Sequence, residues 1–257
     1  MVAAMIRELG DSLQEALGAL GRYALFGARL VAETPRALLR FGLVVEQVHN
    51  AGALSLVIIM LSGLFVGMVL GLQGFDLLQR FGSEESLGTA AALGLLKELG
   101  PVITALLFAG RAGTALASEL GLMRATDQLA AIEMMAVDPV RRVVMPRFLG
   151  GVISMPLLAA IFSMIGLFGA QLVGVQLMGV DQGQFWSQMR AAVELDDVME
   201  GVLKSVVFGV ACSLVAVYEG YHSLPTAEGV GRATTRTVVI SSVSVLLLDY
   251  MLTAVML

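Results

Sequence analysis

Charged side chains inside apolar stretches are the residues of this sequence most suited to chemistry. Five of them stand out: Lys97, Glu98, Arg111, Glu119 and Asp249. An ionisable group at the middle of a bilayer costs roughly 2.5 to 3.5 kcal/mol on insertion scales, so such groups face protein or water rather than lipid. Lys97, Glu98 and Asp249 could therefore bind a polar ligand or relay protons or ions.

Motifs of soluble enzymes are absent from the sequence. There is no G-x-x-x-x-G-K-[ST] loop to hold a nucleotide, no H-E-x-x-H zinc motif and no G-x-S-x-G nucleophile elbow. The two histidines and the single cysteine lack metal-ligand spacing, so we expect no metal site and no cofactor on this chain. We expect no enzyme and no nucleic-acid partner. If the protein does work, the energy would come from an ion gradient, from a gradient of its substrate or from another subunit.

The elements that position these charges are expected to be membrane-spanning helices. The chain is 57% hydrophobic and 14% charged, whereas soluble domains carry about 25% charged residues. Apolar runs of about 20 residues suffice to cross the hydrocarbon core. The sequence predicts an all-α integral membrane protein with five spans, at about 52–73, 88–118, 147–178, 198–221 and 237–256. Residues 148–180 carry no charge, which predicts one long tilted helix.

The distribution of arginine predicts the direction of the spans, because cytoplasmic loops are enriched in basic residues. Loops 74–87 and 181–200 hold one arginine each, and together they hold eight acidic residues. The other segments hold most arginines: Arg7, Arg22, Arg29, Arg36, Arg40, Arg124, Arg141, Arg142, Arg147, Arg232 and Arg236. We therefore expect the N-terminus inside and the C-terminus outside.

The first 50 residues are expected to form an interfacial elbow, distinct from a permease domain at 51–257. Leu9, Leu13, Leu17 and Leu20 recur at helical spacing, with polar residues on the other faces. Thr34-Pro35 would break this helix. A second helix, at about 36–49, would lead into the first span.

The loop between the second and third spans is long and has helical order. Thr126 could cap a helix, and Leu129, Ile132, Met135 and Ala136 would form one apolar stripe before Asp138-Pro139 stops it. A helix at about 124–138 would project below the membrane while its flanks stay anchored. It would be either a lever or an ordinary amphipathic interfacial helix.

Residues 95–147 resemble the signature of the MlaE-type permeases. Four elements occur in order: K/R-E-L-G-P, A-G-R-x-G, E-L-G-x-M-R and [TS]-[DE]-Q-[LI]…M-x-V-D-P. FVGMVLGLQ and FGSEESLG are also similar to the family, so the resemblance runs from about residue 50. Lys97 stands where arginine is common and loses the bidentate fork of a guanidinium. Asp127 replaces a common glutamate.

The resemblance implies a permease subunit of a phospholipid ABC transporter in the bacterial inner membrane. It implies a homodimer, a cytoplasmic ATPase that carries ATP and Mg, a periplasmic ring of MCE-domain proteins and, in some systems, a STAS-domain protein. Residues 124–139 would be the helix that couples the ATPase to the spans. The implied ATPase-coupling residues are Arg124, Asp127, Gln128, Leu129, Ile132, Glu133, Met135, Asp138 and Pro139.

A phospholipid needs an apolar path for its tails and polar groups near its headgroup. The candidates for lipid binding are Val66, Leu70, Gln73, Leu93, Leu96, Lys97 and Glu98. Gly63, Gly67 and Gly71 recur every four residues and would allow close helix approach, which gives weak support to a dimer. Arg111 and Glu119 are expected to form structural ion pairs, with Glu219 or Asp249 as possible partners.

Two other function classes remain open at this point. A gradient-driven secondary transporter would use Lys97, Glu98 and Asp249 as its ion path, although no inverted repeat is evident. A membrane-embedded enzyme acting on lipid would leave chemically altered lipid, and the missing catalytic motifs disfavour it. Dependence on an ATPase separates the permease from the secondary transporter.

Overall fold

The computed structural model describes residues 14, 18, 21–34 and 41–256. Leu9, Leu13, Leu17, Leu20 and Pro35, on which the expected N-terminal helix and its break depend, lie outside the described residues. Residues 21–34 are helical. The described part of the chain contains helices and no strands, as the all-α prediction requires.

The elements follow one another with short connections. The first half contains α2 (Phe41–Ala51), η1 (Ala53–Ser55), α3 (Leu56–Arg80), η2 (Glu84–Ser86), α4 (Leu87–Leu93), η3 (Gly94–Leu99), α5 (Gly100–Phe108), η4 (Ala109–Gly113) and α6 (Thr114–Ala125). The second half contains α7 (Gln128–Met134), η5 (Val140–Val144), α8 (Met145–Gln171), η6 (Leu172–Leu177), α9 (Gln182–Ala192), α10 (Leu195–Tyr221) and α11 (Ala227–Met256). The segments η3, η4, η5 and η6 are π-helical.

Five helical runs within the described residues are long and apolar enough to cross a membrane, which confirms the predicted number. They are Gly42–Arg80, Glu84–Ala125, Val140–Leu177, Leu195–Tyr221 and Ala227–Met256. Each helix extends beyond the apolar stretch that predicted it at one end or both, because polar residues continue the helix past the hydrocarbon core. The fifth begins at Ala227 rather than near residue 237.

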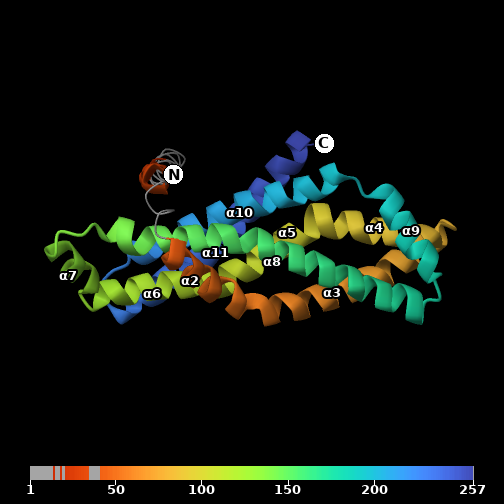
Figure 1. Ribbon diagram of the computed structural model, residues 1–257, viewed down its shortest axis with the longest axis horizontal. Helices are drawn as coiled ribbons and strands as arrows, with labels where there is room; N and C mark the ends of the chain where they lie inside the picture. The colour runs from red at the N-terminus through yellow and green to blue at the C-terminus, as the bar shows by residue number, and fades with distance from the viewer. Residues whose placement is uncertain (1–13, 15–17, 19–20, 35–40, 257) are drawn as a thin grey trace, which may run out of the picture.

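The helices form an elongated bundle whose two ends differ (Figure 1). The short helix α7 lies at one end of the long axis, and α9 lies with α4 at the other. The long helix α8 runs through the bundle and packs against α3, α10, α2 and α5. The loop between the second and third spans is therefore far from the loop that carries α9.

Glycines let α3 and α8 approach each other closely. A Cβ atom on Gly67 would lie 1.9 Å from the Gly166 carbonyl oxygen, and one on Gly63 would lie 2.9 Å from the Phe162 carbonyl oxygen. Small residues permit such contacts in membranes, where van der Waals packing holds helices together. The predicted glycine face is therefore a seam within one chain. It gives no support to a dimer, which corrects that part of the sequence interpretation.

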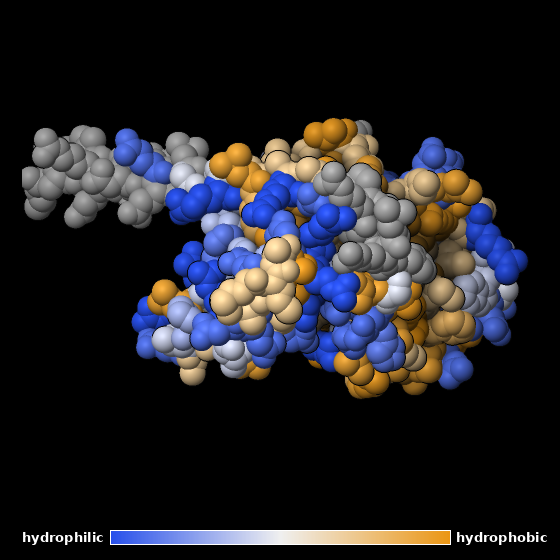
Figure 2. Space-filling view, turned by 60° about the vertical axis from the view of Figure 1, so that its left-hand side comes forward, coloured by the Kyte–Doolittle hydropathy of each residue, from blue (hydrophilic) through white to orange (hydrophobic). Residues whose placement is uncertain are grey.

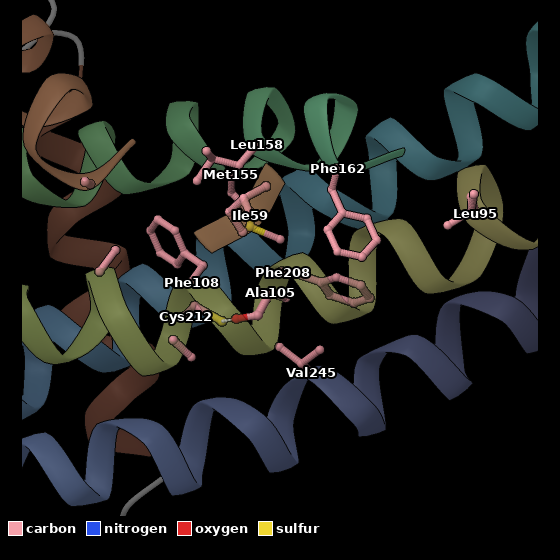
Figure 3. Close-up of a cluster of buried hydrophobic side chains, with 13 residues drawn as sticks. Ile59, Leu95, Ala105, Phe108, Met155, Leu158, Phe162, Phe208, Cys212 and Val245 are labelled. Atoms are coloured by element: carbon pink, nitrogen blue, oxygen red, sulfur yellow. Dashed lines mark hydrogen bonds between the residues drawn. The ribbon is translucent and has the colours of Figure 1, made fainter. Parts of the chain in front are cut away.

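Buried apolar side chains form three clusters within the described residues. The central cluster includes the fully buried Phe108, Phe162 and Phe208, which come from three different spans (Figure 3). A second cluster joins Phe26 and Leu30 to residues of α6, α7, η5 and α8, and a third surrounds Phe185 on α9. Close packing in each cluster fixes the relative positions of the helices that carry the charges.

Candidate functional site

A buried lysine organises the intramembrane charges. The side chain of Lys204 on α10 is fully buried. Its Nζ lies 2.8 Å from Glu98 Oε1, 2.9 Å from Thr253 Oγ1 and 3.1 Å from the Lys97 carbonyl oxygen. Because an ammonium has three protons to donate, these three acceptors satisfy it.

The local backbone explains why the Lys97 carbonyl accepts from a side chain. Proline has no N–H, so Pro101 cannot donate to the carbonyl one turn earlier, which is that of Lys97. The chain around it is the π-helix η3, a distortion that is frequent at functional sites. On α10, Gly201 admits this backbone, since a Cβ there would lie 2.2 Å from the Leu96 carbonyl oxygen.

Lys97 is held at the beginning of α10. Its Nζ lies 2.8 Å from Glu200 Oε2 and 3.1 Å from Asp197 Oδ1. The other Asp197 oxygen accepts the Glu194 backbone N–H at 3.0 Å, which closes a capping box. The ammonium of Lys97 thus has two carboxylate partners within the chain.

Together these groups form what we call the charge cluster: Lys97, Glu98, Asp197, Glu200, Lys204 and Asp249. Lys204 lies 3.4 Å from Glu200 and 3.9 Å from Asp249. The cluster contains two ammonium groups and four carboxyl groups. It joins the second, fourth and fifth spans, and the side chain of Glu98 remains 40% exposed.

The structure gives Arg111 and Glu119 partners other than those considered from the sequence. The Arg111 guanidinium donates to the Asn50 carbonyl oxygen at 3.2 Å and to Ser55 Oγ at 3.3 Å, so its acceptors are uncharged. Glu119 does form an ion pair, with Arg147 at 3.4 Å. Sequence spacing could not identify these partners because they lie on other helices.

Glu219 belongs to a separate contact at the α7 end. It lies 3.3 Å from Arg236 and accepts a hydrogen bond from the hydroxyl group of Tyr23. Burial, together with this carboxylate, raises the pKa of Tyr23 above its usual range. Tyr23 is therefore neutral at physiological pH and can donate to Glu219.

The residues suggested for the lipid tails do not gather in one cavity. Val66 and Leu70 pack against the central cluster, Leu93 is half-buried and Gln73 is exposed. Leu96 lines an apolar groove of about 200 Å³ between α8 and α10, together with Pro101 and Ser163. The groove and the charge cluster share this part of η3 and α10.

The helix in the loop between the second and third spans is shorter than expected. Thr126 ends α6 instead of capping α7, and Asp127 precedes α7 in a left-handed conformation with φ of 55°. The helix stops at Met134, and Ala136 has φ of 58°, so the chain turns before Asp138-Pro139. These corrections arise because two positive-φ residues delimit the helix, and neither is glycine.

The apolar stripe of α7 is also shorter than expected. Leu129 is buried and Ile132 packs against the same cluster, whereas Met135 is 67% exposed. Most of the other suggested coupling residues are exposed: Asp127, Gln128, Glu133 and Asp138. Pro139 is buried.

Arg124 is directed into the protein. Its guanidinium donates to the Tyr221 carbonyl oxygen at the end of α10. A cavity of about 450 Å³ opens beside this contact and is lined by residues of α6, α7 and the loop after α10. Figure 2 turns the α7 end toward the viewer and shows hydrophilic side chains gathered over it. At this end, polar side chains on the surface therefore cover an apolar core.

Sequence reasoning missed Asp197, Glu200 and Lys204 as members of the charge cluster, and Thr253 as an acceptor for Lys204. One signal could have found Lys204: it is the single charge between Gly201 and Tyr218 of the fourth span, and Asp249 is the single charge of residues 237–256 in the fifth. Charges inside membranes pair with one another, so neighbouring spans with one charge each are expected to meet there. Among the described residues, no group of three or more His, Cys, Asp or Glu could hold a metal ion.

Comparison with known proteins gives consistent results. The family profile described as Permease MlaE matches residues 44–255. The chain is 54% identical to the intermembrane phospholipid transport system permease protein MlaE of Haemophilus influenzae, over all of this chain and 98% of that protein. It is 36% identical to a probable ABC transporter permease protein of Rickettsia bellii, over 91% of this chain and 90% of the relative. A probable ABC transporter permease protein of Synechocystis is 32% identical over 82% of this chain and 80% of that relative.

Proposed function

Because the chain belongs to the MlaE permease family, we propose that it is the permease subunit of an ABC transporter that moves phospholipid. The transport would run between the inner membrane and a periplasmic path of MCE-domain proteins to the outer membrane. The Haemophilus relative is named for intermembrane phospholipid transport, and identity over the whole chain supports the same cargo. This likeness is the observation that carries the proposal.

The energy would come from a separate ATPase chain that binds ATP and Mg. This chain has no nucleotide-binding loop of its own, and its Rickettsia and Synechocystis relatives are named as ABC transporter permeases. The helix α7 is suited to receive the motion. Its buried Leu129 fixes it to the core, while Gln128 and Glu133 present a polar face that could lie in a groove of the ATPase.

The bundle would lie in the inner membrane with its α7 end in the cytoplasm and its α9 end in the periplasm. The arginine-rich segments predict this direction. Helix 21–34 would lie along the cytoplasmic surface as the interfacial element, followed by α2 as the second arm of the elbow. The C-terminus would then be periplasmic. A ring of MCE-domain proteins would meet the α9 end, and a STAS-domain protein could bind the ATPase.

A second copy of the chain would complete the permease. In the most apolar stretch of α11, 11% of the residues are buried within one chain, compared with 56% in the corresponding stretches of the α8 and α10 spans. A span so little covered by its own chain has an apolar face available to a partner helix or to lipid. We place the homodimer contact on this helix.

The phospholipid would lie near η3 and the beginning of α10. The apolar groove that Leu96 lines could take part of a tail, and the exposed part of Glu98 and the ammonium of Lys97 could meet the headgroup. Val66, Leu70, Gln73 and Leu93 would contribute to the tail path only if the spans rearrange during transport.

The test is reconstitution of the purified complex in vesicles, with measurement of ATP hydrolysis and of lipid transfer to an acceptor. Glu133→Arg on α7 should lower the lipid moved per ATP while ATPase binding and the permease fold persist. Glu46→Arg, a matched exposed substitution on α2, should leave this ratio unchanged. Lipid transfer that follows an imposed ion gradient and needs no ATPase would support the secondary transporter instead, and Lys97, Glu98 and Asp249 would then be tested as its ion path. Chemically altered lipid would support the enzyme.

A further inference from the structure

The N-terminal helix 21–34 has two faces of different character. Phe26 and Leu30 are buried in the cluster that also contains Leu129 of α7. The opposite face is apolar and exposed, and it consists of Ala24, Leu25, Ala28, Val31 and Ala32. One helix thus connects the core under α7 with a face suited to the membrane surface.

Polar contacts attach this helix to the segment that follows α7. Arg29 lies 3.0 Å from Asp138 Oδ2, and Glu33 lies 3.9 Å from Arg141. The other Asp138 oxygen accepts the Val140 backbone N–H at 2.9 Å, at the beginning of η5. Asp138 is therefore oriented by the backbone when it pairs with Arg29.

The same helix also reaches the ends of the last two spans. Tyr23 donates to Glu219 of α10, and Glu219 pairs with Arg236 of α11. The aromatic rings of Tyr23 and Phe26 contact Tyr218. Helix 21–34 therefore connects the segment after α7 to both spans without passing through α6 or α8.

The helix α7 depends on such external contacts for its position. A helix of seven residues is too short to be stable alone in water. Asp127 and Ala136, in left-handed conformations before and after it, set the direction in which it leaves the bundle. The buried residue of α7 is Leu129, which holds the helix near its beginning. A second contact just after its C-terminal end therefore also affects its orientation.

We propose that Arg29 is a positioning residue that braces α7 through Asp138. Asp138 then contacts helix 21–34 of its own chain, in addition to any contact with a partner protein. The consequence for transport rests on the proposed function, because a less restrained α7 would transmit less of the ATPase motion. The consequence for the structure does not rest on it and can be measured on the permease alone.

The first measurement is amide hydrogen exchange of the full chain in lipid nanodiscs. Arg29→Glu places a carboxylate beside Asp138, and the loss of an exposed ion pair of this kind changes a local equilibrium by roughly two- to fivefold. We expect the amides of residues 131–137 to exchange faster by this factor. Arg22→Glu is the matched control, since Arg22 is exposed on the same helix and forms no ion pair with any residue the structure describes.

A charge swap gives the decisive comparison. Asp138→Lys alone should speed exchange, because it removes both the pair and the cap on Val140. Adding Arg29→Glu to that variant should slow exchange, the opposite of its effect in the wild-type chain. The brace is overturned if Arg29→Glu matches Arg22→Glu, if it acts in the same direction in both backgrounds, or if α8 and α10 exchange faster to the same extent.

The transport consequence is measured afterwards with the ATPase bound. Arg29→Glu should lower the lipid moved per ATP, with assembly and basal ATP hydrolysis retained, and Arg22→Glu should not. Unchanged coupling in Arg29→Glu would overturn the functional part of the proposal. Absence of ATP-driven lipid transfer in the wild-type complex would count against the proposed function and would leave the exchange result standing.

Discussion

Replacing Lys204 by methionine tests whether the buried ammonium holds the charge cluster together. Methionine has a similar length and no charge, so it removes the contacts to Glu98, Thr253 and the Lys97 carbonyl while largely keeping the volume. The carboxyl groups of the cluster then lose their central cation. We expect η3 and the first half of α10 to separate more readily.

The magnitude follows from the geometry. At an effective dielectric constant of about 20, opposite unit charges 2.8 Å apart attract by about 6 kcal/mol, and desolvation of the buried ammonium offsets much of this. Removing one partner of a buried pair destabilises proteins by about 3 to 5 kcal/mol. Since the Glu98 side chain is 40% exposed, solvent screens part of the remaining charge, and we expect about 2 to 4 kcal/mol.

Hydrogen exchange of the permease in nanodiscs measures this loss locally. A change of 2 to 4 kcal/mol corresponds to about 30- to 700-fold faster exchange of the amides near residues 94–99 and 197–208. The double variant Lys204→Met/Glu98→Gln removes one of the orphaned charges and should recover a substantial part of the loss. Thr114→Ser, on α6 away from the cluster, serves as the control substitution.

Two results would refute the reasoning. Exchange at wild-type rates in Lys204→Met would mean that the cluster contributes nothing to helix association. Equal losses in the single and double variants would mean that the lost carbonyl and hydroxyl contacts, rather than the orphaned carboxylate, dominate the energetics.

Two further predictions concern packing. Gly67→Ala should destabilise the bundle by about 1 to 3 kcal/mol, because its Cβ would lie 1.9 Å from the Gly166 carbonyl oxygen and backbone must move. Gly110→Ala, which meets nothing within 4 Å, should not lower the melting temperature, and equal melting of the two variants would contradict the α3–α8 seam. Leu129→Ala should release α7 at a cost of about 2 to 5 kcal/mol, seen as faster amide exchange in residues 131–135. The exposed Met134→Ala should leave that exchange unchanged, and an equal effect of both would show that Leu129 does not anchor the helix.

The sequence by itself determined the class of the protein and the number of its spans. Continuous charge-free apolar runs of about 20 residues cross lipid as helices, because a helix bonds every backbone polar group within the segment. The motifs between residues 95 and 147 indicated the family, since they follow one another with fixed local spacing. Both kinds of information are local along the chain and need no knowledge of which helices touch.

The partners of the charged residues were decided only by the tertiary structure. Lys204 meets Glu98 across 106 positions of sequence, and the Lys97 carbonyl needs it because Pro101 has no N–H. The sequence suggested an acidic partner for Arg111, whereas the structure shows uncharged acceptors at the beginning of the first span. Such contacts depend on how helices pack, and periodicity on one helix does not specify its neighbours.

The boundaries and attachment of α7 also required the structure. Asp127 and Ala136 adopt left-handed conformations that residue type alone does not predict, since glycine is the usual residue there. The contact between Arg29 and Asp138 joins two segments that are 109 positions apart. The sequence could indicate that an amphipathic helix lies between two spans, but only the contacts of helix 21–34 show how that helix is held.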